Sequence, residues 1–582
     1  MLVEIKRKEK IMTTTLPNIF TNTNKGNGII LSPLKMRKYL EKKGFAQFMT
    51  SEDRTAKRFY VQDDNNVLKI HNADTIKHFI IKEVEKCIDG EDLESKLEED
   101  AENLLNAIAR RKGDMIENQV LKLLPVTADI ECEDASEIKL ATDTNKKSYF
   151  RFKNGVVVVT AEDIKLVEYA DLKDEGLIWE SNIIKRNITL DNVYGGLFEK
   201  FAVNALKVRD EKLKGANDDW TREYPLTPSV ITNLESLKSA LGYLIQRDNT
   251  DQKCVVFVDR DSTPGSENGG NGKTFIMDSI KHFTGVVQID GKQLFNNGGT
   301  RFAYENVTPA TGLIHIDETD AKFDFKNLFS VITGDFVVDG KGKKKIIITE
   351  DKKPKFGITT NYILSGRGNS HTRRQHIVEF GNYWNACEEL HGEHPSDEKH
   401  LGKMLFQRDF TDQDWNQFYM FGFRCVQLYL KDGLKKGSKG TYEEKRILTS
   451  CVPKSPEVQQ FIYDYVLNKR VALGHFEDGV ADYALYALFT SQVGENIAKY
   501  WDITKFKKTL FSYVSQLEGY DWNPEKSHKG DTLKSRLVRV GSRDNQVSVI
   551  RIVHANDNDD KNAFFEYLYE VSPTYRSLMD AA

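Results

Sequence analysis

The sequence predicts a multidomain α/β protein, and three observations support this class. The chain has 582 residues, and at roughly 150 residues per domain it should contain about four domains. Near its centre, short apolar runs typical of buried strands alternate with helical patterns, and a glycine-rich loop joins one of these strands to a helix. On either side, helical and β patterns follow in separate blocks. We expect an N-terminal α+β region, a helical collar, a central P-loop core and a C-terminal winged-helix-like domain.

Composition narrows the class of protein. Hydrophobic residues make up 39% of the chain and charged residues 29%, which is enough for several cores. No apolar run approaches the roughly 20 residues of a membrane span, and the basic segment from Met1 to Met12, either of which could be the start, lacks the apolar stretch of a signal peptide. The six cysteines show no C-x-x-C spacing, which is typical of reduced thiols. We therefore expect a cytoplasmic protein without a membrane partner.

The net charge of −4 bears on nucleic-acid binding. A chain with this balance has no global positive field, so any contact with DNA must come from local basic patches.

Residues 1–124 are expected to form the N-terminal α+β domain. Ser32-Pro33, a helix cap followed by proline, predicts a helix that runs to Gly44. Two β-patterned runs at 58–61 and 67–70 flank a turn sequence and predict a hairpin. Residues 74–88 and 92–111 have helical periodicity.

Residues 125–184 are expected to form a small β-rich unit, and residues 185–250 a helical segment. Lys153-Asn154-Gly155 stands between two β-patterned runs and is a strong hairpin signal. The later segment has apolar residues at helical spacing, among them Leu197, Phe201, Leu206, Leu237, Leu241 and Leu244.

The central core begins near residue 251 with a strand, a glycine loop and a helix. The apolar run 254–258 precedes Gly269-Gly270-Asn271-Gly272-Lys273-Thr274, and an amphipathic segment starts at Phe275. In this context glycines let backbone N–H groups converge on phosphate oxygens. We expect this loop and Phe275 to bind ATP, Lys273 to reach its β- and γ-phosphates, and Thr274 to hold Mg²⁺.

One position departs from the pattern G-x-x-x-x-G-K-[ST]. The first glycine would fall at Glu267, so the turn there must be built differently. Gly265, Gly269 and Gly270 are the candidates to take up the bend.

Two later strands end in polar residues that suit catalysis. The run 312–316 ends in Asp317 and Glu318, and we expect Asp317 to order the Mg²⁺ shell and Glu318 to polarise the attacking water. The run 355–360 ends in Asn361, whose amide can orient that water. Arg373 and Arg374 follow, and one of them is expected to act as an arginine finger in a neighbouring subunit's site. Arg374 is favoured because it is nearer the following strand.

A lysine-rich hairpin is expected between these two strands. The apolar runs 336–338 and 346–348 flank a turn with Asp-Gly, the sequence that favours tight hairpins. The turn and the start of the second run hold the residues that we expect to contact DNA phosphates: Lys341, Lys343, Lys344 and Lys345. An ordinary basic solvent turn is the alternative.

Residues 386–455 are expected to form a helical extension and, from 434 onward, a linker rich in Lys, Gly and Ser. Cys387, His391 and His394 could be three zinc ligands, but no fourth is nearby, so a metal site is the less favoured interpretation.

Residues 456–582 show helical patterns followed by two β-patterned runs, which predicts a winged-helix-like domain. Several basic residues there could face DNA phosphates, with a solvated charged surface as the alternative: Lys505, Lys507, Lys508, Arg536, Arg539 and Arg543.

The order of the central motifs resembles the superfamily 3 helicases of the AAA+ class. Gly-Gly-Asn-Gly-Lys-Thr, Thr333-Gly334-Asp335 and Thr360-Asn361-Tyr362 are similar to the poxvirus/phage-type primase-helicase branch, and the specific motifs cover residues 250–385. The resemblance implies an AAA+ ATPase core at 251–385, a collar for oligomerisation at 185–250 and a hairpin in the pore of a hexameric ring.

The same resemblance implies a function. The chain would be an ATP- and Mg²⁺-dependent replicative helicase of a phage, virus or plasmid-like element that moves on single-stranded or forked DNA. Its candidate partners would be a polymerase, a primase and a single-strand binding protein.

Two alternatives stay open at this point. The N-terminal half could add primer synthesis, since Asp129, Glu131 and Glu133 alternate as primase acids do, although no Ser-x-His companion is present. The chain could also be an initiator or clamp scaffold in which ATP only drives assembly. Glu318 favours turnover over this last function, because a module that does not hydrolyse ATP does not need it.

Overall fold

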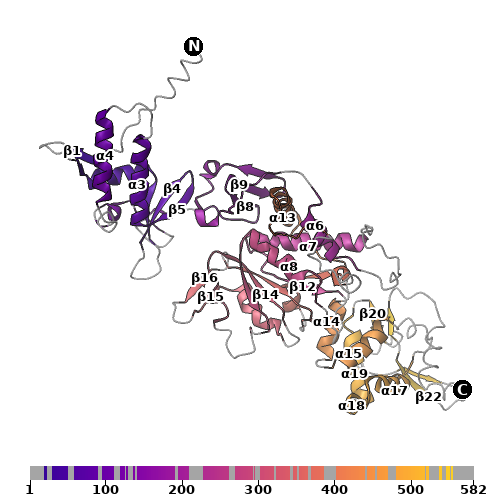
Figure 1. Cartoon of the computed structure of the whole chain (residues 1–582). Helices are drawn as coiled ribbons and strands as arrows, with labels where there is room; N and C mark the ends of the chain where they lie inside the picture. The colour runs from indigo at the N-terminus through magenta and orange to yellow at the C-terminus, as the bar shows by residue number, and fades with distance from the viewer. Residues whose placement is uncertain are drawn as a thin grey trace. The chain divides into compact units, whose positions relative to one another are not determined.

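The protein is a mixed α/β multidomain chain that contains a parallel sheet, as the computed structural model in Figure 1 shows. Contacts divide it into two compact units: residues 1–159 with 163–190, and residues 160–162 with 191–582. The six domains expected from the sequence are a finer division and stay a prediction. The structure describes residues 19–22, 29–49, 58–88, 95–110, 118, 120–124, 126–128, 136–137, 140–190, 194–208, 227–260, 269–292, 294, 302–319, 323–340, 345–349, 353–364, 369–385, 401–438, 442–452, 455–468, 480–517, 519–522, 536–539, 546–550 and 552–554.

The first unit is organised around a six-stranded sheet in the order β11-β5-β4-β3-β6-β7. Its centre is antiparallel and comprises β3 (Phe45–Met49), β4 (Arg58–Asp64) and β5 (Val67–His71), which confirms the hairpin predicted there. Parallel strands extend both sides: β6 (Val126–Ala128), β7 (Ser136–Glu137) and β11 (Ile178–Trp179). The sheet therefore crosses the predicted boundary at 124/125. Periodicity identifies strands but not their partners, so the sequence could not reveal this pairing.

Three helices accompany this sheet. α2 (Pro33–Lys42) begins where predicted, with the Ser32 hydroxyl accepting from the Lys35 N–H. α3 (Ala73–Ile88) and α4 (Ser95–Ala109) match the predicted helices, and their apolar faces share one core with α2. The remaining short elements are β1 (Phe20–Asn22), which pairs with β2 (Ile29–Leu31), and the 3-10 helix η1 (Leu121–Leu123).

A second sheet of the first unit has three strands. β8 (Lys147–Phe152) and β9 (Gly155–Thr160) are the two arms of the predicted hairpin, and β10 (Ile164–Val167) pairs with β9. Two 3-10 helices follow, η2 (Tyr169–Leu172) and η3 (Glu180–Asn182).

The second unit is built on a parallel sheet in the order β13-β14-β17-β12-β18. Its strands are β12 (Cys254–Asp259), β13 (Gly285–Asp290), β14 (Thr311–Asp317), β17 (Lys355–Thr359) and β18 (Gln375–Phe380). β12, β14 and β17 are buried along nearly their whole length, as parallel strands covered on both faces are. β12 is almost continuously apolar for that reason, whereas β14 and β17 also contain buried polar residues, among them His315 and Lys355. β17 lies between β12 and β14, so the end of β17 emerges between the glycine loop and the acid pair.

Helices of the second unit pack close to this sheet. α8 (Lys273–Ser279) follows the glycine loop and continues into η5 (Ile280–His282). α6 (Leu197–Ala205) and α7 (Pro228–Ile245) confirm the helices predicted within 185–250, and α7 packs along α13 (Asp412–Asp432).

Two contacts fix the position of α7. A Cβ on Gly242 would lie 2.0 Å from the Cys425 carbonyl oxygen of α13, so only glycine permits this approach. The buried Lys355 ammonium of β17 donates to the Tyr243 and Gln246 carbonyls at the end of α7. These bonds satisfy carbonyls that a helix end otherwise leaves without partners.

The hairpin predicted at 336–349 is confirmed. β15 (Phe336–Val338) pairs antiparallel with β16 (Ile346–Ile348). Short helices flank it along the chain: η7 (Phe325–Leu328), α9 (Phe329–Thr333) and α10 (Asn369–Thr372).

The last part of the second unit packs around its own core. Its helices are α14 (Tyr442–Cys451), α15 (Pro456–Tyr463), the π-helix η8 (Asp464–Asn468), α17 (Asp482–Val493), α18 (Glu495–Ala498) and α19 (Ile503–Val514). Its strands are β19 (Val480–Ala481), β20 (Tyr520–Trp522), β21 (Arg536–Arg539), β22 (Gln546–Ile550) and β23 (Ile552–His554). β22 pairs with β19 and β21, and β20 pairs with β23. The winged-helix assignment stays a prediction.

The predicted linker at 434–455 is wrong in its second half, where α14 lies. Leu448 of this helix is buried in the C-terminal core, and Tyr442 is buried in the core around the parallel sheet. The Tyr442 hydroxyl also accepts from the Leu364 N–H at 3.2 Å. The residues before 442 are rich in Lys, Gly and Ser, which is typical of a linker. The prediction continued this linker too far, past the point where apolar residues resume. Among the described residues, no helix combines the length and apolar character needed to cross a bilayer.

Candidate nucleotide-binding site

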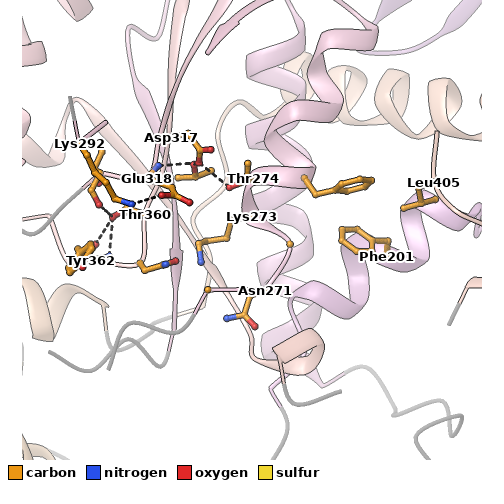
Figure 2. Close-up of a pocket in the computed structure, with 17 residues that line it drawn as sticks. Phe201, Asn271, Lys273, Thr274, Lys292, Asp317, Glu318, Thr360, Tyr362 and Leu405 are labelled. Atoms are coloured by element: carbon orange, nitrogen blue, oxygen red, sulfur yellow. Dashed lines mark hydrogen bonds and ion pairs between the residues drawn. The ribbon is translucent and has the colours of Figure 1, made fainter. Parts of the chain in front are cut away.

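A cavity of about 470 Å³ lies at the carboxyl edge of the parallel sheet. Loops after β12, β14 and β17 form most of its wall, because the carboxyl ends of parallel strands meet at one edge. Figure 2 shows Lys273, Thr274, Asp317 and Glu318 gathered on one side, with Phe201 and Leu405 on the other. The lining includes most of the residues predicted from the sequence: Gly269, Gly270, Asn271, Gly272, Lys273, Thr274, Phe275, Asp317, Glu318 and Asn361.

The glycine loop needs its glycines for two physical reasons. Gly270 and Gly272 have φ values of 98° and 84°, in the left-handed region that side chains with a Cβ rarely adopt. A Cβ on Gly272 would also lie 2.9 Å from the Phe201 ring. Gly265 and Glu267, which bear on the irregular start of the motif, lie outside the described residues.

Lys273 is held by an acid that the sequence analysis missed. Its Nζ lies 2.5 Å from Oδ2 of Asp259, the last residue of β12, and both side chains are under a tenth exposed. Asn271 donates to the other Asp259 oxygen at 3.0 Å. Burial lowers the pKa of Lys273, while Asp259 and Asp317 act in the opposite direction. One carboxylate thus binds two residues of the glycine loop.

Asp317 is the centre of a hydrogen-bond cluster. Its Oδ1 accepts from the Thr274 hydroxyl at 3.0 Å, from the Glu318 N–H at 3.1 Å and from the Thr359 hydroxyl. Its Oδ2 accepts from the Gln288 amide at 3.0 Å. Thr359 and Gln288 were not predicted, since a threonine or glutamine in a strand carries no motif signal.

Glu318 stands in the strained position after β14. Its φ of 52° lies in the left-handed region, which is uncommon for a residue with a side chain. The carboxylate lies 2.5 Å from the Lys292 ammonium, and both side chains are more than half exposed. This hydrogen bond raises the pKa of Lys292. An exposed pair of this kind contributes little stability, so ligands in the cavity can readily displace it.

Asn361 lines the same cavity and lies beside the glycine loop. A Cβ on Gly269 would lie 3.5 Å from the Asn361 amide nitrogen, so the loop and this amide are near neighbours. The preceding turn is fixed by Thr360, whose hydroxyl accepts from the Tyr362 N–H at 3.0 Å.

The two predicted finger arginines have different environments. Arg374 is buried, its guanidinium stacks 4.6 Å from the Phe329 ring centroid, and it donates to the Ser370 carbonyl at 3.1 Å. Arg373 is exposed. Neither lines the cavity of its own chain. The burial of Arg374 argues against the preference for it that rested on its position in the sequence, because a finger must be accessible to a neighbouring subunit.

Only some of the lysines and arginines predicted to contact DNA are among the described residues. Lys341, Lys343 and Lys344 lie outside the described residues, and Lys345 is 60% exposed, with its ammonium 3.5 Å from Asp339. In α19, Lys507 pairs with Asp482 at 2.6 Å and Lys505 donates to the Tyr500 carbonyl, while Lys508 is exposed. Nothing is described of the side chains of Arg536, Arg539 and Arg543.

The other predicted acids and metal ligands are also outside the described residues: Asp129, Glu131, Glu133, Cys387, His391 and His394. Among those that are described, no group of three or more His, Cys, Asp or Glu side chains is placed to hold a metal.

The oxygen donors of the cavity nevertheless fit Mg²⁺ bound together with a nucleotide. Mg²⁺ takes oxygen ligands, often one or two protein groups plus phosphates and water. The Thr274 hydroxyl and the Asp317 carboxylate, 3.0 Å apart beside Lys273, offer that combination.

No protein-family model matches this chain, and no curated protein matches it. Among solved structures, the chain is similar to the apo A form of the NrS-1 C terminal region, with 12% identity, a TM-score of 0.34 and coverage of 89% of this chain and 100% of that one. A second structure of the NrS-1 C terminal region gives 11% identity, a TM-score of 0.32 and coverage of 90% and 99%. These values are too low to bear on fold or function.

Proposed function

We propose that this chain is an ATP-dependent DNA helicase that acts as a homo-oligomeric ring, as its resemblance to superfamily 3 AAA+ helicases implies. The observation that supports this most is that one cavity gathers residues from three separate segments: Lys273 and Thr274 at the start of α8, Asp317 and Glu318 at the end of β14, and Asn361 after β17. Together they have the functional groups that phosphoryl transfer requires.

Each of these residues has a role in the proposed reaction. Lys273 binds the β- and γ-phosphates. To do so, its ammonium must exchange its contact with Asp259 for contacts with the phosphates. Thr274 and Asp317 hold Mg²⁺, which neutralises charge on the phosphates. Glu318 polarises the attacking water, and Asn361 orients it. Phe201, Phe275 and Leu405 provide an apolar wall that suits a nucleotide base.

The ring and its DNA contacts belong to the same proposal. Arg373, exposed on its own subunit, completes the site of a neighbour as the finger. The hairpin that carries Lys341, Lys343, Lys344 and Lys345 contacts the phosphates of single-stranded DNA in the pore of a hexamer. Forked DNA and replication proteins such as a polymerase, a primase and a single-strand binding protein are the proposed partners, in a phage, virus or plasmid-like element.

Two other functions compete with this one. A bifunctional primase-helicase would use acids of the N-terminal half, and an initiator or clamp scaffold would bind ATP without turnover. The pairing of Glu318 with Asp317 beside the glycine loop favours turnover over the scaffold.

An ATPase assay with and without single-stranded DNA, combined with light scattering, tests the proposal. We expect Mg²⁺-dependent hydrolysis that single-stranded DNA stimulates, and a particle of several subunits. A chain that assembles and binds ATP but never hydrolyses it would support the scaffold instead. Primer synthesis from nucleoside triphosphates on a single-stranded template would support the bifunctional protein.

A further inference from the structure

A buried histidine stands in the strand that leads to Asp317. His315 of β14 is 0% exposed, and the residues on either side of it, Ile314 and Ile316, belong to the apolar core. Because side chains alternate along a strand, His315 and Asp317 lie on the same face of the sheet. A buried polar side chain in such a position must have hydrogen-bond partners, and those of His315 point toward the nucleotide site.

His315 joins two other elements of the site. Its Nδ1 lies 2.9 Å from Oδ1 of Asp278, on the helix α8 that follows the glycine loop. Its Nε2 lies 2.9 Å from the Thr359 hydroxyl, at the end of β17. The close approach of α8 makes this geometry possible: a Cβ on Gly357 would lie 2.7 Å from the Met277 sulfur, so the helix rests directly on this face.

These contacts form a chain that ends at Asp317. The Thr359 hydroxyl has a single hydrogen and donates it to Asp317 Oδ1. The same hydroxyl oxygen lies 2.9 Å from His315 Nε2. Asp278, His315 and Thr359 thus reach the same carboxylate oxygen that Thr274 contacts at 3.0 Å.

We infer that Asp278, His315 and Thr359 are positioning residues that hold the Asp317 carboxylate in the orientation required for Mg²⁺. The inference rests on the proposed function, in which Asp317 holds that metal. Mg²⁺ demands near-ideal geometry, so a carboxylate fixed by outer hydrogen bonds binds it better than one that rotates. The chain also connects α8, β14 and β17, which carry Lys273, Asp317 and, just beyond β17, Asn361.

A purely structural role is the competing explanation, since any satisfied buried polar cluster stabilises its surroundings. The two roles differ in what they change. Loss of a structural cluster lowers stability and weakens every ligand, whereas loss of a positioning chain weakens metal binding and leaves metal-free nucleotide binding intact.

The test uses Thr359→Val in the full chain, which keeps the shape of the side chain and removes the hydroxyl. Metal binding is measured directly with Mn²⁺ in the presence of ADP, by the loss of the free Mn²⁺ EPR signal. Nucleotide binding is measured separately with a fluorescent ADP analogue in EDTA. We expect Thr359→Val to weaken Mn²⁺ binding about 10- to 100-fold, as loss of an outer-sphere partner typically does, with no change in EDTA. Thr359→Ser should restore metal binding.

Thr311→Val is the matched control. It removes a buried hydroxyl from the opposite end of β14, where Thr311 contacts Thr308 at 3.0 Å, and should leave Mn²⁺ binding unchanged. His315→Leu and His315→Gln form a second pair in case Thr359→Val does not fold. The glutamine amide can still donate toward Thr359, so His315→Gln should bind Mn²⁺ more tightly than His315→Leu.

Equal Mn²⁺ affinity in Thr359→Val and the wild type would overturn the inference, and so would equal weakening by Thr359→Val and Thr311→Val. A wild-type chain that binds Mn²⁺ with ADP but hydrolyses no ATP would refute the proposed ATPase while leaving the positioning chain measurable. A wild type that binds no Mn²⁺ with nucleotide would refute both.

Discussion

Replacing Lys273 with methionine should cost folding stability as well as nucleotide affinity. The Lys273 ammonium lies 2.5 Å from Asp259, and the two side chains are only 6% and 8% exposed. Removing one partner of a buried ion pair typically costs about 3–5 kcal/mol, because a charge stays buried without its counter-charge. Asn271 keeps its 3.0 Å contact with the Asp259 carboxylate, so we expect the lower end, about 3 kcal/mol.

A double-mutant cycle separates the two effects. The free energy of unfolding is measured in denaturant for the wild type, Lys273→Met, Asp259→Asn and the double variant. Asparagine has the shape of aspartate without its charge, so the double variant should recover most of the stability that Lys273→Met loses. It should not recover nucleotide binding, which needs the Lys273 charge.

Glu318→Gln supplies the control for this cycle. It removes one partner of an exposed pair with Lys292, which should change stability by less than about 1 kcal/mol. If Lys273→Met is as stable as the wild type, or if the double variant is no more stable than Lys273→Met, the coupling of Lys273 to Asp259 is refuted.

Three further predictions concern turnover, DNA and pH. Arg373→Ala should reduce turnover by roughly 10³-fold. If the finger acts in trans, mixing Arg373→Ala subunits with Lys273→Met subunits should restore part of the activity. Mixed rings that form but never recover activity would refute the trans assignment. Replacing Lys343, Lys344 and Lys345 with alanine should abolish unwinding and spare basal ATPase. The slope of log affinity for single-stranded DNA against log salt concentration should fall by about 0.7 for each phosphate that the hairpin no longer neutralises. An unchanged slope would exclude the hairpin as the main DNA-binding element. Burial, with a smaller effect of Lys253, holds the pKa of His376 at about 4. The unfolded chain therefore takes up this proton first as pH falls, so protonation of His376 should lower the free energy of unfolding by up to about 3 kcal/mol between pH 6.5 and pH 4. The wild type should lose this much more stability over that range than His376→Gln, and equal losses would refute the assignment.

The sequence predicted those site residues that follow buried strands. Parallel strands are nearly continuous apolar runs, and their carboxyl ends meet at one edge, so Thr274, Asp317, Glu318 and Asn361 could be assigned to one place before the fold was known. The cavity at that edge brings the four together.

The partners of these residues could not be predicted in the same way. Asp259, Lys292 and Thr359 reach the site because of the order of the strands in the sheet and the path of the loops. The periodicity of the sequence does not encode either of these. Thr359 can reach Asp317 only because β17 lies next to β14, between β14 and β12. For the same reason the sequence did not reveal that β6 joins a sheet with β3.

The choice between Arg373 and Arg374 depends on burial rather than on position in the chain. Adjacent residues at a turn before a strand point in different directions, so nearness to β18 says little about which guanidinium is accessible. Arg374 is turned inward, over the Phe329 ring and onto the Ser370 carbonyl. A guanidinium engaged in this way is costly to withdraw, because it would give up both its stacking and its hydrogen bond. Arg373 has its side chain at the surface. Arg374 therefore holds the turn, and Arg373 is the arginine of the pair whose side chain is left accessible to a partner.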